Sequence, residues 1–562
     1  MFAEFYWGHS PIDYLDGTDT ETQEKAAYVT DDIDLDPFCM NVSYSCQILL
    51  ERLLTTRDGY SPALIPWGKP TKDLSGMCQW CQDRGVANTS HEHRIRDCPS
   101  ESNLHHGWDL LMAPAIDNDI VDNGIVPVDT EDDEAQSLFV DAFLHNNRLE
   151  HLIQLMGYHP KYLDCFLKTQ QFILRGDGPL PQPYRHYIAI MAAGRHQCSY
   201  LINIQRTEFL LQDGDERWLN GLEHIPTKLM NLYEINKLMA HRPWLINKSH
   251  IEKLTRGEDN WSLSELMQAI VILAQFHALC SFIYGCGINP EIDHEDGHSS
   301  RPMSVTDASV VENSSSPGLS QNSSHSCTPN SLPEGQSCIE QLLKRMRQLT
   351  EEAQVEMTQE ELLKRFQRVE DQNAELVPVA KQPSPQADIL RYVDDADFVY
   401  QDFAKRGHTA EIPTFRALDY SWEDQGFSLA NRLYSDIGSL LDDKFTTTYN
   451  LTYNTMGQKA NVDTSAFRRA IWNYIHCLFG IRHDDYDYSE VNQLLERPLK
   501  NYIKIVTCFP ERVCKKDYDS YMREFEHSEK VHINLMLLEA RLQGELLYAL
   551  RAIMKYMTYC PS

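Results

Sequence analysis

The spacing of hydrophobic residues divides the chain into four segments and predicts helices in three of them. In residues 135–288 and 389–562 apolar side chains recur every three or four positions, as in amphipathic helices that pack against a core. Residues 1–134 are acidic with few helical periods, so we expect a largely disordered N-terminal region. Residues 289–388 begin rich in serine, proline and asparagine and then return to a charged helical pattern. The pattern predicts an all-α protein, with two helical domains joined by a linker that is first disordered and then helical.

The helical part of the linker carries two short apolar stripes. They consist of Leu342, Leu343, Met346 and Leu349, followed by Leu362, Leu363 and Phe366. Because no heptad is sustained across them, these stripes favour surfaces that pack against the rest of the protein over a coiled coil.

The longest apolar stretch runs from Leu266 to Ile288 and contains Gln268, Gln275 and His277. Polar groups inside so short a span are costly in lipid, where each unsatisfied group costs several kcal/mol. We therefore predict a buried core helix and no membrane association.

The net charge and the cysteine content indicate which partners and which cellular compartment to expect. Lys and Arg number 51 against 82 Asp and Glu, giving a net charge of −31, which opposes binding to phosphate backbones and makes a nucleic-acid role unlikely. The N-terminus, MFAEFYWGHS, has no basic segment leading into an apolar one, so we expect the chain to stay inside the cell. In that reducing compartment the 15 scattered cysteines are expected to be free thiols.

One cysteine cluster in the N-terminal region has the spacing of a metal site. Cys78, Cys81, His93 and Cys98 form the pattern C-x₂-C-x₁₁-H-x₄-C, which can complete a tetrahedral zinc site. His91 could replace His93, and the alternative is a set of unrelated free thiols in a disordered tail. This zinc ion is the only cofactor that the sequence suggests, and none is required.

The stretch AGRHQCSYLINIQ, residues 193–205, places one cysteine, Cys198, on an expected helix. A reactive thiolate needs a base, a cation or a helix N-terminus to stabilise it. A base two turns along the same helix face would stand at position 205, which is Gln205. Cys198 is therefore either a nucleophile or a small buried residue of the core.

Several long blocks resemble the sestrin family. They are HYIAIMAAGRHQCSYLI, EINKLMAHRPWLI, TFRALDYSWEDQG, NLTYNT, RRAIWNYIHCLFGIRHDDYDYSEVNQLLERPLKNYIK and HSEKVHINLMLLEARLQGELLYALRAI. The resemblance implies two helical subdomains of the alkylhydroperoxidase type. It also implies a stress-induced inhibitor of target-of-rapamycin signalling, located in the cytoplasm with the nucleus as a second location. Such proteins bind the GATOR subcomplex that activates the pathway, and leucine releases them.

The resemblance also implies a hydroperoxide-reducing activity, which is the alternative function. Cys198 matches the family's redox cysteine and Tyr200 its relay tyrosine, whereas the relay histidine falls on Gln205. A neutral amide cannot transfer a proton near neutral pH, and loss of general-base help typically costs about 10²- to 10⁴-fold in rate. Leu201 offers no resolving thiol, so we expect a weak cysteine-dependent peroxidase at best.

The same resemblance implies an amino-acid site in the second helical domain. Glu529 would hold the ammonium group and Arg468 the carboxylate, although a buried Arg and Glu often form only a structural ion pair. The remaining positions are Thr452, Thr455 and Thr464 as a lid, Tyr453 and His532 nearby, and Phe467, Met522 and Phe525 as the apolar wall. Phe467 and Met522 stand where vertebrate members carry leucine and tryptophan, so we expect weaker or broader binding than in those relatives.

The acidic run HDDYDY resembles the patch through which the family engages its GATOR partner. Asp484 and Asp485 are the matching pair, and Ser262 matches a partner-contact serine in the first helical domain. A solvated acidic loop is the alternative interpretation of such a run.

Overall fold

The structure, a computed structural model, describes residues 124–146, 148–257, 259–290, 338–351, 357–376, 387–408, 412–451, 455–457 and 459–559. Within these residues helices dominate, and the strands form two sheets of two short strands each, which confirms the all-α prediction. The candidate zinc ligands Cys78, Cys81, His93 and Cys98 lie outside the described residues. In the described part of the chain, no group of three or more His, Cys, Asp or Glu side chains is placed to hold a metal ion.

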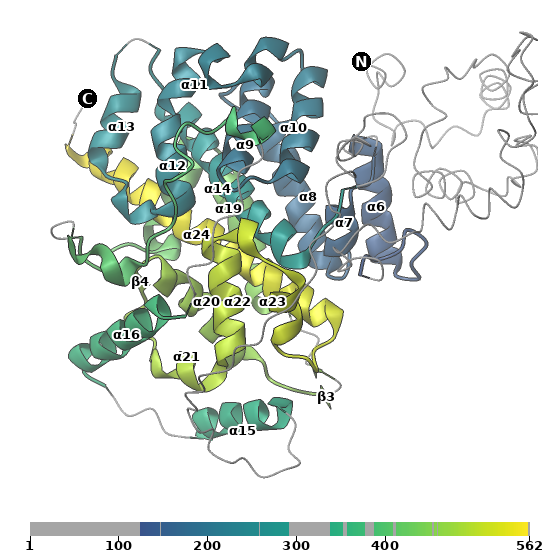
Figure 1. The fold of residues 1–562 in the computed structure, drawn as a ribbon, viewed down its shortest axis with the longest axis vertical. Coiled ribbons are helices and arrows are strands. Elements are labelled where there is room, and N and C mark those ends of the chain that lie inside the picture. The colour runs from purple at the N-terminus through teal and green to yellow at the C-terminus, as the bar shows by residue number, and fades with distance from the viewer. Residues whose placement is uncertain are drawn as a thin grey trace, which may run out of the picture.

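The first half of the fold is a bundle of helices, coloured blue to teal in Figure 1. Its helices are α6 (Asp133–Asn146), α7 (His151–Met156), α8 (Pro160–Leu174), α9 (Gln182–Arg195), α10 (Ser199–Leu211), α11 (Thr227–Asn231), α12 (Tyr233–His241), α13 (Lys248–Thr255) and α14 (Leu263–Cys286).

Helix α14 has clear start and stop signals. Ser262 Oγ accepts a hydrogen bond from the N–H of Glu265, whose carboxylate accepts one from the N–H of Ser262. Gly287 ends the helix in the left-handed region at φ 65°. Among the described helices, α14 alone is long and apolar enough to cross a membrane, but that apolar window is entirely buried inside the protein. The sequence prediction of a core helix is confirmed.

The linker contributes α15 (Cys338–Glu351), α16 (Gln359–Ala374) and the short α17 (Ala387–Leu390). Leu342, Met346 and Phe366 from the two predicted stripes are buried. Helix α16 packs against α20 and α21 of the second half, and α15 lies at the lower end of the molecule in Figure 1. The stripes are therefore packing surfaces, as their irregular spacing predicted.

The second half (green to yellow in Figure 1) contains further helices and the four short strands. Its helices are α18 (Phe427–Leu433), α19 (Ile437–Asn450), α20 (Ser465–Leu478), α21 (Ser489–Leu494), α22 (Arg497–Cys508), α23 (Lys515–Ser520) and α24 (His527–Tyr559). Strand β1 (Phe415–Arg416) pairs in parallel with β4 (Ile481–Arg482), and β2 (Thr455–Met456) forms an antiparallel hairpin with β3 (Lys459–Ala460).

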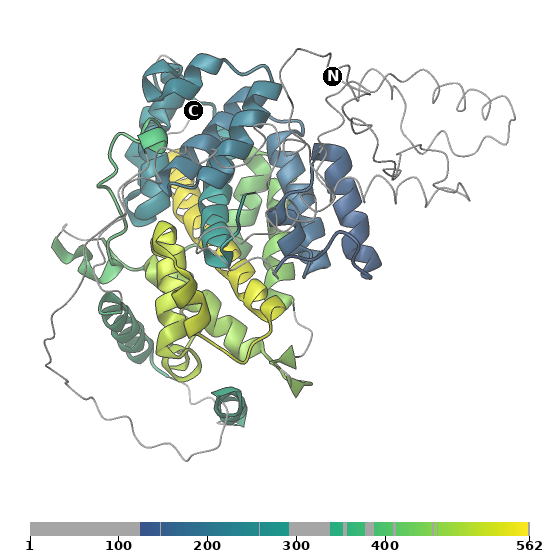
Figure 2. The same cartoon turned by 45° about the vertical axis from the view of Figure 1, so that its right-hand side comes forward.

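The last helix, α24, packs along α14 and joins the two halves into one core, as both Figures 1 and 2 show. At this junction the fully buried Arg541 donates hydrogen bonds to Glu545 Oε1 (2.9 Å), Ser281 Oγ (2.7 Å) and His196 Nε2 (2.7 Å). His277 contacts the other oxygen of Glu545 at 2.7 Å. The buried charges of Arg541 and Glu545 in the second half therefore have polar partners in the first half.

Candidate functional site

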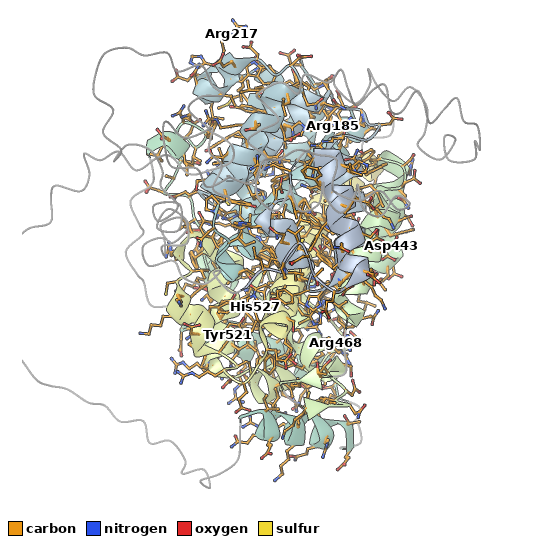
Figure 3. The ribbon with its side chains drawn as sticks, turned by 90° about the vertical axis from the view of Figure 1, so that its right-hand side faces the viewer. Arg185, Arg217, Asp443, Arg468, Tyr521 and His527 are labelled. Atoms are coloured by element: carbon orange, nitrogen blue, oxygen red, sulfur yellow. The ribbon has the colours of Figure 1, made fainter. Side chains whose placement is uncertain are left out.

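The predicted amino-acid site lies where the end of α19, the β2–β3 hairpin and the first turns of α20 and α24 meet. We call Thr464, Phe467, Arg468, Phe525 and Glu529 the Arg468–Glu529 cluster. Figure 3 shows Arg468 in the lower half of the molecule with His527 at the start of α24, whereas Arg185 and Arg217 lie in the upper half. Thr452 and Tyr453 lie outside the described residues.

The Arg468 side chain is fixed by hydrogen bonds to Thr464, just before α20, and to the end of α19. Its Nε donates to Thr464 Oγ1 at 3.0 Å, and its Nη1 donates to the carbonyl of Tyr449 at the end of α19. The residue is only 8% exposed, and this burial lowers the pKa of its guanidinium. The side chain is a buried cation with donors fixed in direction, which suits recognition of a carboxylate.

Glu529 is the anion of the cluster and lies in the first turn of α24, where a negative charge is favoured by the helix dipole. Both of its carboxylate oxygens accept from the backbone N–H of Gly457, at 2.9 and 3.0 Å, and Oε2 also accepts from the N–H of Glu526. Burial raises the pKa of Glu529, and these N–H donors oppose that rise. The carboxylate therefore ties the hairpin to the start of α24.

Gly457 occupies a position that favours glycine. Its φ is 60°, and a Cβ there would stand 2.4 Å from the Ile339 side chain of α15 and 2.9 Å from the carbonyl oxygen of Glu524. On the same hairpin, Lys459 Nζ lies 3.0 Å from Glu340 of α15. The hairpin is thus held between Glu529 on one side and the linker helix on the other.

The apolar wall is built from the first turn of α20 and from the segment that precedes α24. The rings of Phe467 and Phe525 meet edge to face with centroids 6.1 Å apart, and Met522 is 4% exposed. Met522 has φ 39°, an uncommon conformation for a residue with a side chain. Phe467 and Met522, the two positions that we predicted to differ from vertebrate relatives, are therefore both buried.

Two histidines lie beside the cluster and are neutral. His532 Nε2 contacts the carbonyl of Thr448 at 3.0 Å, and burial lowers its pKa to about 3, with Arg468 contributing. The His159 ring lies 5.5 Å from it, and burial lowers the pKa of His159 to about 4. Near neutral pH the two histidines therefore add no charge to the cluster.

Several predicted positions that the structure describes contact one another. Thr464 accepts a hydrogen bond from Arg468, and the ring of Phe467 contacts that of Phe525. His532 is close enough to Arg468 for its pKa to be lowered by that charge. Thr455 lies in the hairpin, and its hydroxyl hydrogen bonds to Glu529. Sequence reasoning missed Tyr449, Gly457 and His159. Gly457 carried one usable signal, since glycine after a short alternating stretch is typical of a tight hairpin.

The local structure at Cys198 differs from its prediction. We expected Cys198 inside a continuous helix, but α9 ends at Arg195 and α10 begins at Ser199, so that helix assignment is wrong. Gln197 adopts φ 54°, and the N–H of Cys198 bonds to the carbonyl of Ala193, which turns the chain out of α9. The argument that Cys198 and Gln205 share one helix face therefore fails, because Cys198 precedes the helix.

The side chains around Cys198 are buried and already partnered. Cys198 is 1% exposed, and Gln205 Oε1 accepts a hydrogen bond from His186 Nδ1 at 2.8 Å. The Tyr200 hydroxyl contacts the N–H of Leu152 at 3.4 Å. A further thiol, Cys280 of α14, hydrogen bonds to Cys198, and burial holds the pKa of Cys280 well above its usual range.

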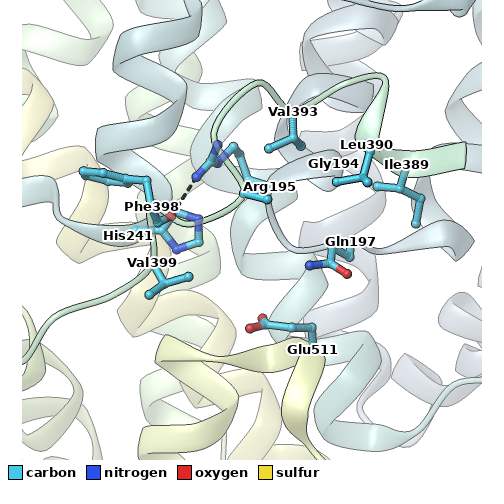
Figure 4. Close-up of a pocket in the computed structure, with 11 residues that line it drawn as sticks. Gly194, Arg195, Gln197, His241, Ile389, Leu390, Val393, Phe398, Val399 and Glu511 are labelled. Carbon is cyan, nitrogen blue, oxygen red and sulfur yellow. Dashed lines mark hydrogen bonds between the residues drawn. The ribbon is translucent and has the colours of Figure 1, made fainter. Parts of the chain in front are cut away.

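Figure 4 shows a small cavity next to this position. Its volume is about 20 Å³, and Arg195, Gln197, His241 and Glu511 are among the side chains that line it. Arg195 Nη2 donates to the Phe398 carbonyl at 2.8 Å, which closes one wall. Such a volume holds about one water molecule.

The predicted partner residues differ in their surroundings. Ser262 is exposed and caps α14. Asp485 projects outward with its side chain 84% exposed, and Arg469 lies 3.5 Å from it. Asp484 is only 11% exposed, and its Oδ1 accepts from Arg482 at 2.8 Å. The two aspartates therefore face in different directions, which the sequence pattern alone did not indicate.

Comparisons with known proteins agree on one family. A family model described as PA26 p53-induced protein (sestrin) matches residues 116–557. Sestrin-1 of Xenopus laevis is 51% identical over 437 residues, covering 77% of this chain and 90% of that protein. Sestrin-2 of Homo sapiens is 51% identical over 431 residues, covering 75% of this chain and 87% of that protein. A sestrin homolog of Drosophila melanogaster is 47% identical over 463 residues, covering 73% and 93%.

Proposed function

We propose that this chain, which belongs to the sestrin family, is a stress-responsive, amino-acid-regulated inhibitor of target-of-rapamycin signalling. It acts by binding the GATOR activating subcomplex, and leucine or a related amino acid releases it. The observation that carries the proposal is the Arg468–Glu529 cluster, in which a buried cation and a carboxylate flank an aromatic and methionine wall.

The chemistry of a free amino acid matches this arrangement. Its ammonium needs a carboxylate, its carboxylate needs a directed cation, and its side chain needs an apolar surface. Glu529, Arg468 and the Phe467–Phe525 pair supply one group of each kind. Because Met522 is flexible and Phe467 is bulky, we expect the wall to accept methionine or isoleucine as well as leucine.

The β2–β3 hairpin connects the proposed ligand site to the linker helix α15. Glu529 now accepts the N–H of Gly457, so an arriving ammonium competes with the hairpin for the same carboxylate. The hairpin also contacts α15 through Lys459 and Glu340. Ligand binding is therefore coupled to the position of the hairpin and its linker helix.

The test is capture of the purified GATOR activating subcomplex by the full chain, with and without added amino acids. We expect capture without amino acid and release by leucine at millimolar concentration, quantified by immunoblot and mass spectrometry. Arginine and aspartate are the matched controls, because the apolar wall offers their charged side chains no partner, and they should leave capture unchanged. Absence of capture, or capture insensitive to every apolar amino acid, overturns the proposal.

A cysteine-dependent alkyl hydroperoxide reductase is the second candidate. It is supported by the place of Cys198 just before the N-terminus of α10, a position that stabilises thiolates, and by the adjacent thiol of Cys280. If this activity exists, Cys198→Ser should abolish consumption of cumene hydroperoxide, whereas serine at the exposed Cys514 should leave it unchanged. Equal rates for the wild type and Cys198→Ser would remove this candidate.

A further inference from the structure

Leu418 is an exposed apolar side chain on a turn whose backbone is firmly held. The side chain lies in the turn after β1, and the residue is 69% exposed. The N–H of Ala417 bonds to the carbonyl of Arg482 at 2.8 Å, and the N–H of Asp419 bonds to the carbonyl of Arg416 at 3.0 Å. The turn is thus fixed on both sides of Leu418.

The third restraint on this turn is the carboxylate of Asp484. Its Oδ2 accepts the N–H of Leu418 at 3.1 Å, while its Oδ1 accepts from Arg482 and lies 3.5 Å from Arg416 Nε. Since the Asp484 side chain is 11% exposed and already has these partners, little of it is available to another protein. The Asp484 carboxylate thus restrains the turn that carries Leu418.

Two carboxylates face outward beside Leu418, and each is more exposed than the arginine paired with it, which is Arg469 for Asp485 and Arg416 for Asp419. The side chains of Asp485 and Asp419 are 84% and 53% exposed, one following Asp484 and the other following Leu418. An apolar contact with carboxylates next to it is complementary to an apolar pocket with a basic rim.

We propose that Leu418 is the apolar anchor of the partner surface and that Asp484 is a positioning residue that holds the Leu418 turn. The occupant is a folded protein with an apolar pocket bordered by lysine or arginine side chains. This inference rests on the proposed function, because it assigns the contact through which the GATOR subcomplex is bound. A leucine on a pre-formed turn loses little conformational freedom on binding, so its burial contributes efficiently to affinity.

The experiment measures binding of the purified GATOR activating subcomplex to full-length variants without amino acid. Leu418→Ser should weaken binding about 10-fold or more, as expected for removal of a buried anchor. Leu211→Ser is the matched control, because Leu211 at the end of α10 is also 69% exposed and should tolerate the change. Wild-type affinity in Leu418→Ser, or an equal loss in Leu211→Ser, overturns the assignment of Leu418.

A double-mutant cycle tests the role of Asp484. If Asp484 acts only through the turn, Asp484→Ala combined with Leu418→Ser should bind no more weakly than Leu418→Ser alone. Asp485→Lys should lower affinity additively with Leu418→Ser, since its carboxylate makes a contact of its own. Additive losses from Asp484 and Leu418 would contradict the positioning role.

If the wild type does not bind at all, the proposed function and this inference both fail. If the wild type binds and Leu418→Ser binds with the same affinity, this inference alone is removed.

Discussion

Replacing Arg541 by methionine is expected to lower the free energy of unfolding by about 3–5 kcal/mol, the usual cost of removing one partner of a buried ion pair. Arg541 and Glu545 both have fully buried side chains, so the substitution leaves the Glu545 carboxylate buried with only His277 beside it. Methionine retains most of the length of the side chain, which limits the contribution of a new cavity. The measurement is chemical denaturation followed by circular dichroism.

The matched control for this prediction is Arg256→Met. Arg256 pairs with Glu252 in the same i, i+4 arrangement, but its side chain is 59% exposed. Exposed pairs of this kind typically contribute less than about 1 kcal/mol, so the control should unfold almost as the wild type does. If Arg541→Met is also within about 1 kcal/mol of the wild type, the buried network does not stabilise the junction between the halves.

The contrast between these two pairs shows what sequence patterns can and cannot locate. The longest apolar stretch predicted α14, and helical periodicity placed the residues of α24 in the second helical domain. It could not separate Arg541 and Glu545 from a surface pair, because the groups that satisfy Arg541 include Ser281 and His196, which lie far away in the sequence. Burial of a charge depends on such distant partners, and local spacing does not contain them.

The break between α9 and α10 was missed for a different physical reason. Helix ends are usually marked by glycine or proline, and here the left-handed position is occupied by Gln197. The surrounding residues, HQCSY, have no breaker, so periodicity continued the helix through Cys198. Its N-terminal position in α10 emerges only once the chain is folded against α14.

The amino-acid site was predicted as a set of residue types, whereas its internal connections were not. Family resemblance supplied Arg468, Glu529 and the wall. The hydrogen bond from Gly457 to Glu529 crosses 72 positions and depends on where the hairpin lies against α24. This contact, which the sequence did not indicate, places a donor of the chain itself on the carboxylate that we propose as the ligand's ammonium partner.

Replacing Arg468 by methionine or Glu529 by glutamine is expected to weaken leucine binding about 10- to 100-fold each, because each change removes a charge-assisted hydrogen bond worth about 1.5–3 kcal/mol. Isothermal titration calorimetry on the full chain measures this loss. Arg469→Met is the matched control, since Arg469 is the next residue of α20 but contacts Asp485 at the surface. Leucine affinity unchanged in Arg468→Met, or reduced equally in Arg469→Met, would contradict the assignment.

Glutamine and alanine at position 529 separate charge from hairpin attachment. Glu529→Gln keeps an oxygen that can accept the Gly457 N–H, so it should weaken the ligand while the hairpin stays attached. Glu529→Ala should also release the hairpin, which hydrogen exchange of the Gly457 amide detects as faster exchange than in Glu529→Gln. Equal exchange in both variants would mean that the carboxylate does not anchor the hairpin. If the wild type gives no heat with leucine, isoleucine, valine or methionine at millimolar concentration, Arg468 and Glu529 are structural groups, and regulation by amino acids is removed from the proposed function.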